Sequence, residues 1–324
     1  MAVNLTGLRC LVEIVASKLN VSAAAQAMHL SQPSVSRQLR QLEDALGFQV
    51  FARRGRSLVD ITPAGAQAIE VAQRVVRDIE GLRSFSAHAR GEVAAELLIA
   101  APQTFVLHVL PPLLSQLRLR YPGIGVRIRS LGEGDRVQPS EHERFDMVML
   151  STAGDELPEG IAVALFRWKR VVIVNREHPL AQHSGPLSLE ELAGSPLITY
   201  EASRHADSSF YRVMAKAGLT PQFSLSAQDG DTLKAYTRAG LGVGLVAELA
   251  LGASDHAHFA VLQVEERLPD CTLWAVLPRG RVLRYPTIDL LRLLAPQLDP
   301  EALRRASQGM PPDHWPEPPT LRFG

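Results

Sequence analysis

The stretch from residue 20 to residue 47 constrains this chain more than any other, because it predicts two short helices joined by a tight turn. Ser22 would cap the first helix, and the alanines that follow it have high helix propensity. Ser31 would cap the second helix, Pro33 fits its first turn, and Gly47 would end it. Apolar residues recur along the second helix in steps of four, three and four, at Val35, Leu39, Leu42 and Leu46.

The polar face of the second predicted helix carries side chains that can contact DNA. Long or hydroxylated hydrogen-bonding groups of this kind contact base edges and phosphates in the major groove. An ordinary amphipathic helix pair with a solvated polar face is the alternative. The residues that we predict to contact DNA from this helix pair are Ser22, Gln32, Pro33, Ser34, Ser36, Arg37 and Arg40.

A short basic hairpin is predicted directly after the helix pair. Segments 49–51 and 58–61 are typical of strands, and Gly55 between them occupies a turn position that needs a positive φ. Arginines beside a recognition helix can straddle a phosphate backbone or enter a minor groove, although solvated loop charges are the alternative. We predict that Arg53, Arg54 and Arg56 hold phosphates. Residues 1–90 contain 11 Lys and Arg against 7 Asp and Glu, whereas the whole chain contains 34 of each, so the basic excess lies in this part.

A long helix is predicted over residues 63–91. Small and apolar residues recur in it at heptad spacing, at Ala68, Ala72, Val75, Ile79, Leu82 and Ser86. A single helix packed on its own domain could show this pattern. A helix of this length between two domains more readily packs on a second copy, so we predict a homodimer. Such a helix would span about 40 Å and would hold two recognition helices apart on successive half-sites.

The remainder of the chain alternates short apolar runs with helical patterns, which favours α/β architecture with mainly parallel sheets. The expected helices are 106–120, 189–192, 208–217, 232–238 and 287–294. The expected strands are 96–100, 126–130, 147–150, 171–174, 197–199, 223–227, 243–246 and 273–276.

The N-terminal motifs resemble, in order and spacing, those of the LysR-type transcriptional regulators. They are Ser31-Gln-Pro-Ser-Val-Ser, Leu42-Glu43, Leu46-Gly47, Phe51-x-Arg53 and Thr62-Pro-Ala-Gly65. The resemblance implies a winged helix-turn-helix domain at 1–62, a dimerisation helix at 63–91 and an effector-binding domain at 92–300. It further implies two Rossmann-like lobes, arranged as in periplasmic binding proteins, with a cleft between them. Lobe one would comprise about 92–165 with 270–300. The proline-rich segment over 301–324 is expected to be a disordered tail.

Motifs in the second half are similar to those of the CysB-like branch, whose members regulate sulfur assimilation. They are Leu197-Ile-Thr199-Tyr200, Gly218-Leu219-Thr220-Pro221, Asp229-x-Asp231-x-x-Lys234-x-Tyr236 and Gly240-Leu-Gly-Val-Gly244. That branch binds sulfate or an acetylated serine through hydroxyl and amide groups in its first cleft loop. Of the polar residues in that loop, only Thr104 is present here, and Ala101, Pro102 and Phe105 stand at the other polar positions. Ser151 stands where the branch has a threonine in the second loop.

Loops that follow strands supply the candidate effector site, because helix N-termini there can meet an anion. The candidates are Gln103, Thr104, Ser151, Thr152, Thr199, Tyr200, Arg204, His205 and Gln228. The alternative for these hydroxyls is that they cap their own helices. Sulfate, thiosulfate or an acetylserine is one predicted ligand class. An organic acid with an apolar portion, its carboxylate met by Arg204 or His205, is the other.

No motif in the sequence predicts catalysis or a cofactor. The glycines at 240–244 follow a predicted helix and enter a strand, which is the wrong context for a dinucleotide fingerprint. The ten histidines lack metal-ligand spacing, and two cysteines, Cys10 and Cys271, form no framework. No signal peptide or membrane-spanning run is evident, so a cytoplasmic protein is expected.

Together these patterns predict a transcription regulator that binds double-stranded promoter DNA and is controlled by a small effector. The resemblance implies a homodimer or homotetramer and contact with RNA polymerase. Two other classes of protein are less compatible with the sequence. A solute-binding or enzymatic domain with a DNA-binding head lacks support from a signal peptide or a catalytic motif, and an architectural DNA protein would not need the α/β half.

Overall fold

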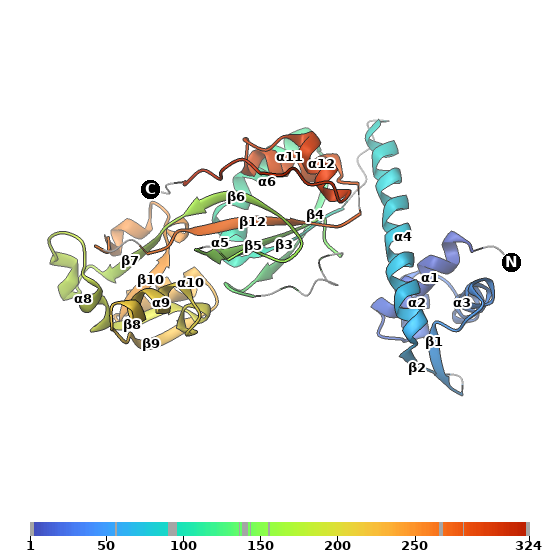
Figure 1. Cartoon of the computed structure of the whole chain (residues 1–324), viewed down its shortest axis with the longest axis horizontal. Coiled ribbons are helices and arrows are strands. Elements are labelled where there is room, and N and C mark those ends of the chain that lie inside the picture. Colours follow the sequence, from blue (N-terminus) through green and yellow to red (C-terminus); the bar gives the residue numbers. More distant parts are fainter. Residues whose placement is uncertain are drawn as a thin grey trace. The chain divides into compact units, whose positions relative to one another are not determined.

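The computed structural model describes residues 3–55, 57–89, 96–135, 137, 142, 144–154, 156–265, 268–280 and 282–321 (Figure 1). The chain divides into two compact units. The first comprises residues 1–90 with 280–282, and the second comprises residues 91–279 with 283–324. None of the described helices is both long enough and apolar enough to cross a membrane.

The first unit is a helix-turn-helix domain with a two-stranded hairpin and a long final helix. Its elements are α1 (Leu5–Ala16), α2 (Val21–Ala27), α3 (Gln32–Leu46), β1 (Phe51–Arg54), β2 (Ser57–Ile61) and α4 (Pro63–Ala89). One apolar core joins them all, and α3 contributes Val35, Leu39 and Leu42 to it, as the helical spacing predicts. The antiparallel hairpin turns at Gly55, whose φ of +65° confirms the predicted left-handed position.

The caps of the two short helices differ in part from prediction. Ser31 caps α3 by accepting a hydrogen bond from the Ser34 backbone N–H, and Gly47 ends that helix at a φ of +77°. The expected cap of α2 is wrong by two residues. Asn20 caps it, accepting from the backbone N–H groups of Ser22 and Ala23 at 3.0 Å each, and Ser22 lies inside the helix.

The start of α4 is fixed by Gly65, which packs closely against the backbone of Val50. The Thr62 hydroxyl accepts from the Gly65 N–H at 2.9 Å and donates to the backbone carbonyls of Gln49 and Val50. A Cβ on Gly65 would lie 2.1 Å from the carbonyl oxygen of Val50. The Thr62-Pro-Ala-Gly65 motif therefore brings the helix backbone against the strand entry, which any side chain would push away.

Gly65→Ala is accordingly expected to lower the free energy of unfolding of the first unit by about 1–3 kcal/mol, as overpacking does in a close-packed core. Urea titration followed by circular dichroism would measure the loss. Gln67→Ala, a change at an exposed position in the same helix turn, is the control and should leave the midpoint nearly unchanged. Equal midpoints for the two variants would contradict this account of the motif.

The apolar stripe on α4 differs from the predicted heptad. Ala72 does not belong to a free seam, because it is buried in the core of its own unit together with Ile69. Val71 and Leu82 are instead exposed, at 54% and 66%. Val75 and Ile79 are half-buried between them, and the side chain of Ser86 lies outside the described residues. The exposed or half-buried apolar stripe thus comprises Val71, Val75, Ile79 and Leu82.

The second unit contains two five-stranded sheets, one in each lobe (Figure 1). The first, in the order β4-β3-β5-β12-β6, is built from β3 (Glu96–Pro102), β4 (Gly125–Leu131), β5 (Met147–Ala153), β6 (Ile161–Trp168) and β12 (Cys271–Leu277). The second, in the order β11-β7-β10-β8-β9, is built from β7 (Arg170–Asn175), β8 (Pro196–Tyr200), β9 (Gln222–Ala227), β10 (Val243–Ala247) and β11 (Phe259–Leu262). The chain crosses from lobe to lobe between β6 and β7 and returns between β11 and β12, as the two-lobed expectation requires.

The sheets are mixed, which corrects the expectation of mainly parallel pairing. β3 pairs in parallel with β4 and β5, and β8 pairs in parallel with β9 and β10. β12 pairs antiparallel with β5 and β6, and β7 pairs antiparallel with β10 and β11. β7 and β12, the first strand after each crossing, are the strands that pair antiparallel on both sides. β6 and β11 were not among the predicted strands.

Helices cover both sheets. In the first lobe they are α5 (Gln103–His108), α6 (Leu110–Arg120), α11 (Tyr285–Leu294) and α12 (Pro300–Ser307). In the second lobe they are α8 (Leu189–Ala193), α9 (Ser209–Lys216) and α10 (Gly230–Arg238), with short 3-10 helices at Pro179–Gln182, Glu201–Arg204, Glu248–Ala250 and Asp255–Ala257. The single helix expected over 106–120 is broken at Val109, just before two prolines at the start of α6.

Residues 301–321 of the C-terminal segment are ordered, contrary to the expectation of a disordered tail over 301–324, of which residues 322–324 lie outside the described residues. Beyond α12 it lies along the edge strand β6, where the Arg167 N–H donates to the Pro319 carbonyl at 2.8 Å and Leu321 donates back to Arg167 at 2.9 Å. Trp315 and Leu321 pack on the core of the first lobe. Prolines suit this place because an edge segment can leave N–H positions unpaired.

Candidate functional site

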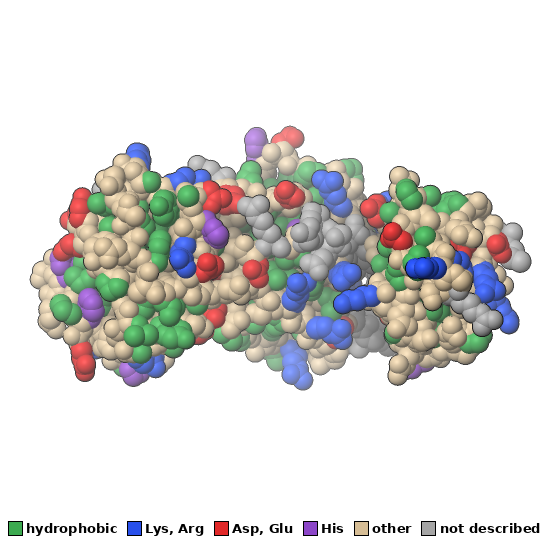
Figure 2. Space-filling model, turned by 90° about the horizontal axis from the view of Figure 1, so that it is seen from below, with side chains coloured by type: hydrophobic (Ala, Val, Ile, Leu, Met, Phe, Trp, Pro, Cys, Tyr) green, Lys and Arg blue, Asp and Glu red, His purple; other side chains and the backbone are tan. Residues whose placement is uncertain are grey.

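The exposed face of α3 presents the predicted DNA-contacting residues. Gln32, Pro33, Arg37 and Arg40 are exposed on it, and Ser34 and Ser36 are half-buried at its N-terminal end. Ser22 is exposed on α2. Lys and Arg side chains lie at the surface of this unit, at the right in Figure 2. The unit therefore offers a helix face of hydrogen-bonding and cationic groups whose opposite face is buried in its core.

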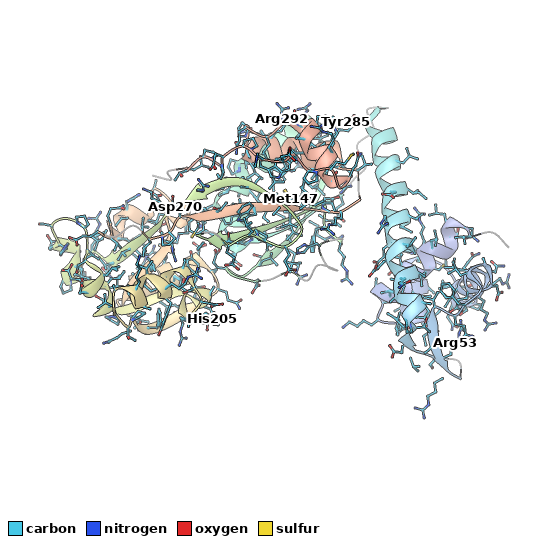
Figure 3. All side chains as sticks on the ribbon, in the orientation of Figure 1. Arg53, Met147, His205, Asp270, Tyr285 and Arg292 are labelled. Carbon is cyan, nitrogen blue, oxygen red and sulfur yellow. The ribbon has the colours of Figure 1, made fainter. Side chains whose placement is uncertain are left out.

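The hairpin arginines differ from one another in their surroundings. Arg54 is exposed, and Arg56 lies outside the described residues. Arg53, labelled in Figure 3, places its guanidinium 2.5 Å from a carboxylate oxygen of Glu43. Glu43 is buried on α3 and also accepts from the N–H groups of Val50 and Phe51. Arg53 thus ties the hairpin to α3, and its contact with a phosphate stays a prediction.

A polar cluster lies where the two lobes meet. The N–H of Glu133, in the loop after β4, donates to the carbonyl of Gln228 in the second lobe at 2.8 Å. The Glu133 carboxyl group is hydrogen-bonded to Ser151 and interacts electrostatically with Arg170. Burial raises the pKa of this carboxyl, while Ser151 and Arg170 act in the opposite direction. Two strands and two loops therefore direct polar groups into one place between the lobes.

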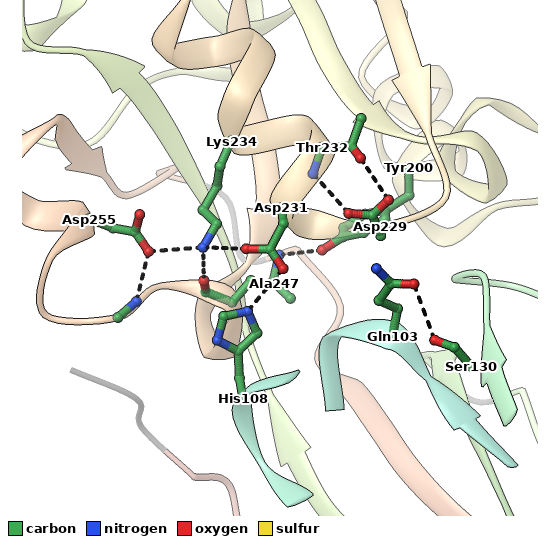
Figure 4. Close-up of polar contacts among 12 residues, drawn as sticks. Gln103, His108, Ser130, Tyr200, Asp229, Asp231, Thr232, Lys234, Ala247 and Asp255 are labelled. Carbon is green, nitrogen blue, oxygen red and sulfur yellow. Dashed lines mark hydrogen bonds and ion pairs between the residues drawn. The ribbon is translucent and has the colours of Figure 1, made fainter. Parts of the chain in front are cut away.

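Tyr200 is a buried member of this interlobe cluster. It is buried at the end of β8, and its hydroxyl accepts from the Ala247 N–H at 3.2 Å (Figure 4). The same hydroxyl is hydrogen-bonded to Thr104 on α5, which is also buried. Gly230 comes so near that a Cβ there would lie 3.0 Å from the Tyr200 hydroxyl. Tyr200 and Thr104 thereby connect the two lobes.

A second set of interlobe contacts surrounds Lys234. Its ammonium group is buried and lies 2.9 Å from Asp231, 2.9 Å from Asp255 and 2.6 Å from the Ala250 carbonyl (Figure 4). Asp231 also lies 3.4 Å from His108 on α5 of the first lobe. Burial tends to raise the pKa of Asp255, but the Gly252 N–H and Lys234 lower it overall. The Asp231-x-x-Lys234 motif therefore holds α10 to both lobes.

Two family models match this chain and together cover most of its length. The model described as "Bacterial regulatory helix-turn-helix protein, lysR family" matches residues 5–66, and "LysR substrate binding domain" matches residues 90–299. The chain belongs to the LysR family of transcriptional regulators. As a LysR-type regulator it is a DNA-binding protein with an effector-binding domain, and the helix face and the interlobe cluster described above lie one in each of these two parts.

Individual relatives of this chain include the regulators CysB and Cbl. The transcriptional regulator CysB of Haemophilus influenzae is 34% identical over 76% of this chain and 76% of its own. The regulator Cbl of Escherichia coli K12 is 30% identical over 93% of this chain and 95% of its own. A full-length OxyR variant from Pseudomonas aeruginosa has the same fold, with a TM-score of 0.64 and 21% identity over 94% of this chain and 100% of that one.

Several predicted effector residues of this LysR-type chain have structural partners. Thr152 accepts from the indole N–H of Trp274 at 2.8 Å, and the buried Thr199 hydroxyl donates to the Leu245 carbonyl at 3.3 Å. Arg204 donates to Ser226 at 3.1 Å and lies over the Phe223 ring. These contacts hold each side chain within its own lobe, and the partners Trp274 and Leu245 are distant in sequence, so neither hydroxyl caps its own helix.

The other predicted effector residues lie nearer the lobe junction or at the surface. Gln103 begins α5, and its side-chain oxygen accepts from Ser130 at 3.2 Å (Figure 4). Gln228 lies against the loop after β4, where a Cβ on Gly132 would be 3.1 Å from its side chain. His205 is exposed after the 3-10 helix of the second lobe (Figure 3). Of the predicted set, Thr104, Tyr200, Ser151 and Gln228 meet around the cluster.

Two residues of the cluster were missed by sequence reasoning. Glu133 lies between two glycines directly after a predicted strand, so the rule that selected the other loops could have found it. Arg170 lies at the start of β7, a position that carries no such signal. The replacement at Phe105 suggested a ligand with an apolar portion, but the Phe105 side chain is buried in the first lobe, with its ring centroid 6.0 Å from that of Phe166 and 6.2 Å from that of Trp168.

Proposed function

We propose that this LysR-type regulator binds promoter DNA through α3 and the hairpin and that a small effector bound between the two lobes controls that binding. The observation that carries the proposal is the interlobe cluster. The Glu133 loop reaches from one lobe to Gln228 of the other, so a ligand held beside it would contact both lobes. A ligand that prefers one arrangement of the lobes shifts the population toward it.

Assembly of two or more copies is part of the proposal. The exposed stripe on α4 would pack on the same stripe of a second copy, as an isologous contact. Two recognition helices would then meet two half-sites, and such dimers could pair further into a homotetramer. The regulator would act in the cytoplasm, bound at a promoter where it can contact RNA polymerase.

The experiment that tests this function starts from total genomic DNA, so the promoter is found by the protein itself. Genomic fragments of the source organism retained by the full-length protein would be sequenced, and a recurring two-half-site sequence is the expected result. Duplexes carrying that sequence would then be titrated with and without candidate effectors. If the retained fragments share no sequence, the protein binds DNA non-specifically and the proposed regulator function is wrong.

The effector itself is expected to stabilise the second unit. A ligand present at about 100 times its dissociation constant stabilises a folded protein by about 2.7 kcal/mol, which a thermal melt resolves. Sulfate, thiosulfate and acetylserines would be compared with aliphatic and aromatic acids, since the sequence predicts both ligand classes. Ser151→Ala should reduce the stabilisation, whereas Ser115→Ala, on α6 with its hydroxyl bonded to Pro111, should not. Undiminished stabilisation in Ser151→Ala would place the effector outside the cleft.

A further inference from the structure

The charge of the interlobe cluster restricts which effector can bind there. We propose that the effector is a small zwitterion of the amino-acid type, whose ammonium group is bound by Glu133 and whose anionic group faces Arg170. This inference rests on the proposed function, because it assumes that the cleft holds an effector. It adds the ligand's chemical class and the residue that selects it.

Glu133 is held in the cleft by its own loop. Its N–H is bonded to Gln228 of the second lobe, and the Asp135 carboxylate accepts from the Gly132 N–H at 2.8 Å within the loop. A Cβ on Gly134 would lie 2.5 Å from the Cβ of Ala202, so the backbone of the loop closely approaches the second lobe. The loop therefore leaves the Glu133 side chain directed between the lobes.

Of the described residues that interact with the Glu133 carboxyl, one is a cation. Ser151 is hydrogen-bonded to its carboxyl group, and the buried groups of Tyr200 and Cys271 lie near enough to interact with it electrostatically. The cation among these neighbours is Arg170, which the carboxyl shares with other partners. One Arg170 nitrogen, Nη2, already donates to Ser209 at 3.0 Å and to the Pro269 carbonyl at 3.2 Å.

Arg170 retains a donor that the protein does not use. Its Nε is buried and has no hydrogen-bond partner within the part of the chain that the structure describes. A buried donor without a partner costs free energy, so a ligand acceptor at this place would be favoured. A ligand carboxylate near Arg170 and a ligand ammonium near Glu133 would satisfy both groups together.

A simple oxyanion fits this cleft less well. Two like charges repel each other strongly in a partly buried site, and an anion beside Glu133 would meet that repulsion. Pro102 at the start of α5 has no N–H to offer an anion. Burial raises the pKa of Glu133, and Ser151 and Arg170 oppose that shift only in part.

The test compares ligand pairs that differ in the ammonium group. O-acetyl-L-serine and N-acetyl-L-serine are isomers, and only the first has an ammonium group. Unmodified L-amino acids and their N-acetyl forms extend the comparison, with sulfate and thiosulfate as oxyanions. Binding to the full-length protein would be measured by calorimetry. At least one ammonium compound is expected to bind at millimolar concentration or below, and more tightly than its N-acetyl partner.

The selecting residue is tested by Glu133→Gln. This variant should raise the dissociation constant of the ammonium ligand by about 10- to 100-fold, because a charge-assisted hydrogen bond is lost. The dissociation constants of N-acetyl ligands should not change. Glu177→Gln alters an exposed carboxylate of the second lobe, after β7 and outside the interlobe cluster, and should leave both classes unchanged. Tighter binding of an oxyanion or an N-acetyl compound, an ammonium affinity unaffected by Glu133→Gln, or no ammonium ligand at all would overturn the inference.

The two proposals fail in distinguishable ways. If an oxyanion or N-acetyl compound binds the cleft and changes DNA binding, the ligand class is wrong and the regulator function stands. If an ammonium ligand binds through Glu133 but leaves DNA affinity and DNA bending unchanged, the ligand class stands and effector control is wrong. DNA titrations with each ligand, run beside calorimetry, separate these outcomes.

The unliganded protein gives an independent readout. A carboxyl whose folded pKa is raised costs stability as pH rises from its unfolded pKa, about 4.3 for Glu, through the folded value. Glu133→Gln should therefore raise the melting temperature at about pH 8 relative to its effect at about pH 5. A variant that melts lower than wild type by the same amount at both pH values would show that Arg170 already satisfies Glu133.

Discussion

Leu82→Glu is expected to split the proposed dimer and, as a consequence, to abolish stable promoter binding. Leu82 is exposed at 66% in the single chain, so a glutamate there costs the isolated subunit little. In an isologous helix pair the new charge would be buried near its symmetry mate without a partner. An uncompensated buried charge costs about 3–5 kcal/mol, which is enough to dissociate a moderately stable dimer.

Sedimentation velocity at several protein concentrations would measure this loss. Ala66→Glu adds the same charge to an exposed position on another face of α4 and should leave the sedimentation coefficient unchanged. Loss of a second half-site would also weaken DNA binding in Leu82→Glu. If Leu82→Glu sediments as wild type does, the stripe from Val71 to Leu82 is not the contact between copies.

Arg37→Ala is expected to weaken binding to the specific promoter sequence by about 1–3 kcal/mol and to relax the choice of sequence, because Arg37 is exposed on α3 where base edges would lie. Arg54→Ala, on the hairpin, should instead weaken all sequences alike and reduce the salt dependence by about one unit of slope. Titrations of specific and scrambled duplexes over a range of salt concentrations would separate these effects.

Arg53 supplies an internal contrast for the same experiment. Its guanidinium is paired with Glu43, so Arg53→Ala should lower the stability of the first unit, and any loss of DNA binding should accompany that loss. Equal losses on specific and scrambled duplexes for Arg37→Ala would remove Arg37 from base readout. If Arg53→Ala changes the salt dependence of DNA binding but not the stability of the first unit, Arg53 contacts a phosphate.

The helix-turn-helix could be predicted because its determinants are local. The apolar spacing of α3, the cap at Ser31 and the left-handed residues Gly47 and Gly55 depend on neighbours within a few positions. The error at α2 has the same local scale. Asn20 and Ser22 are both good caps, and the choice between them depends on where the first helical turn closes.

The cleft was only partly predictable. The rule that loops after strands face a ligand selected Thr104, Ser151 and Gln228, which do meet between the lobes. It could not separate them from Thr152 and Thr199, whose hydroxyls have partners within their own lobes. Hydroxyl groups of the same type differ only in which distant acceptor or donor the fold brings to them, and no spacing in the sequence records that.

Local residue chemistry sufficed to predict the helix pair and the basic hairpin, since these depend on period, caps and turn residues close together in the chain. The family was identified from the resemblance of motifs in this region. The fold alone decided that Arg53 pairs with Glu43 and that Ala72 is buried in its own unit. It also brought Glu133 and Arg170, which lie 37 positions apart, into one cluster. Charges and apolar side chains acquire their roles from neighbours that only tertiary packing supplies, because those contacts depend on how strands from two lobes meet.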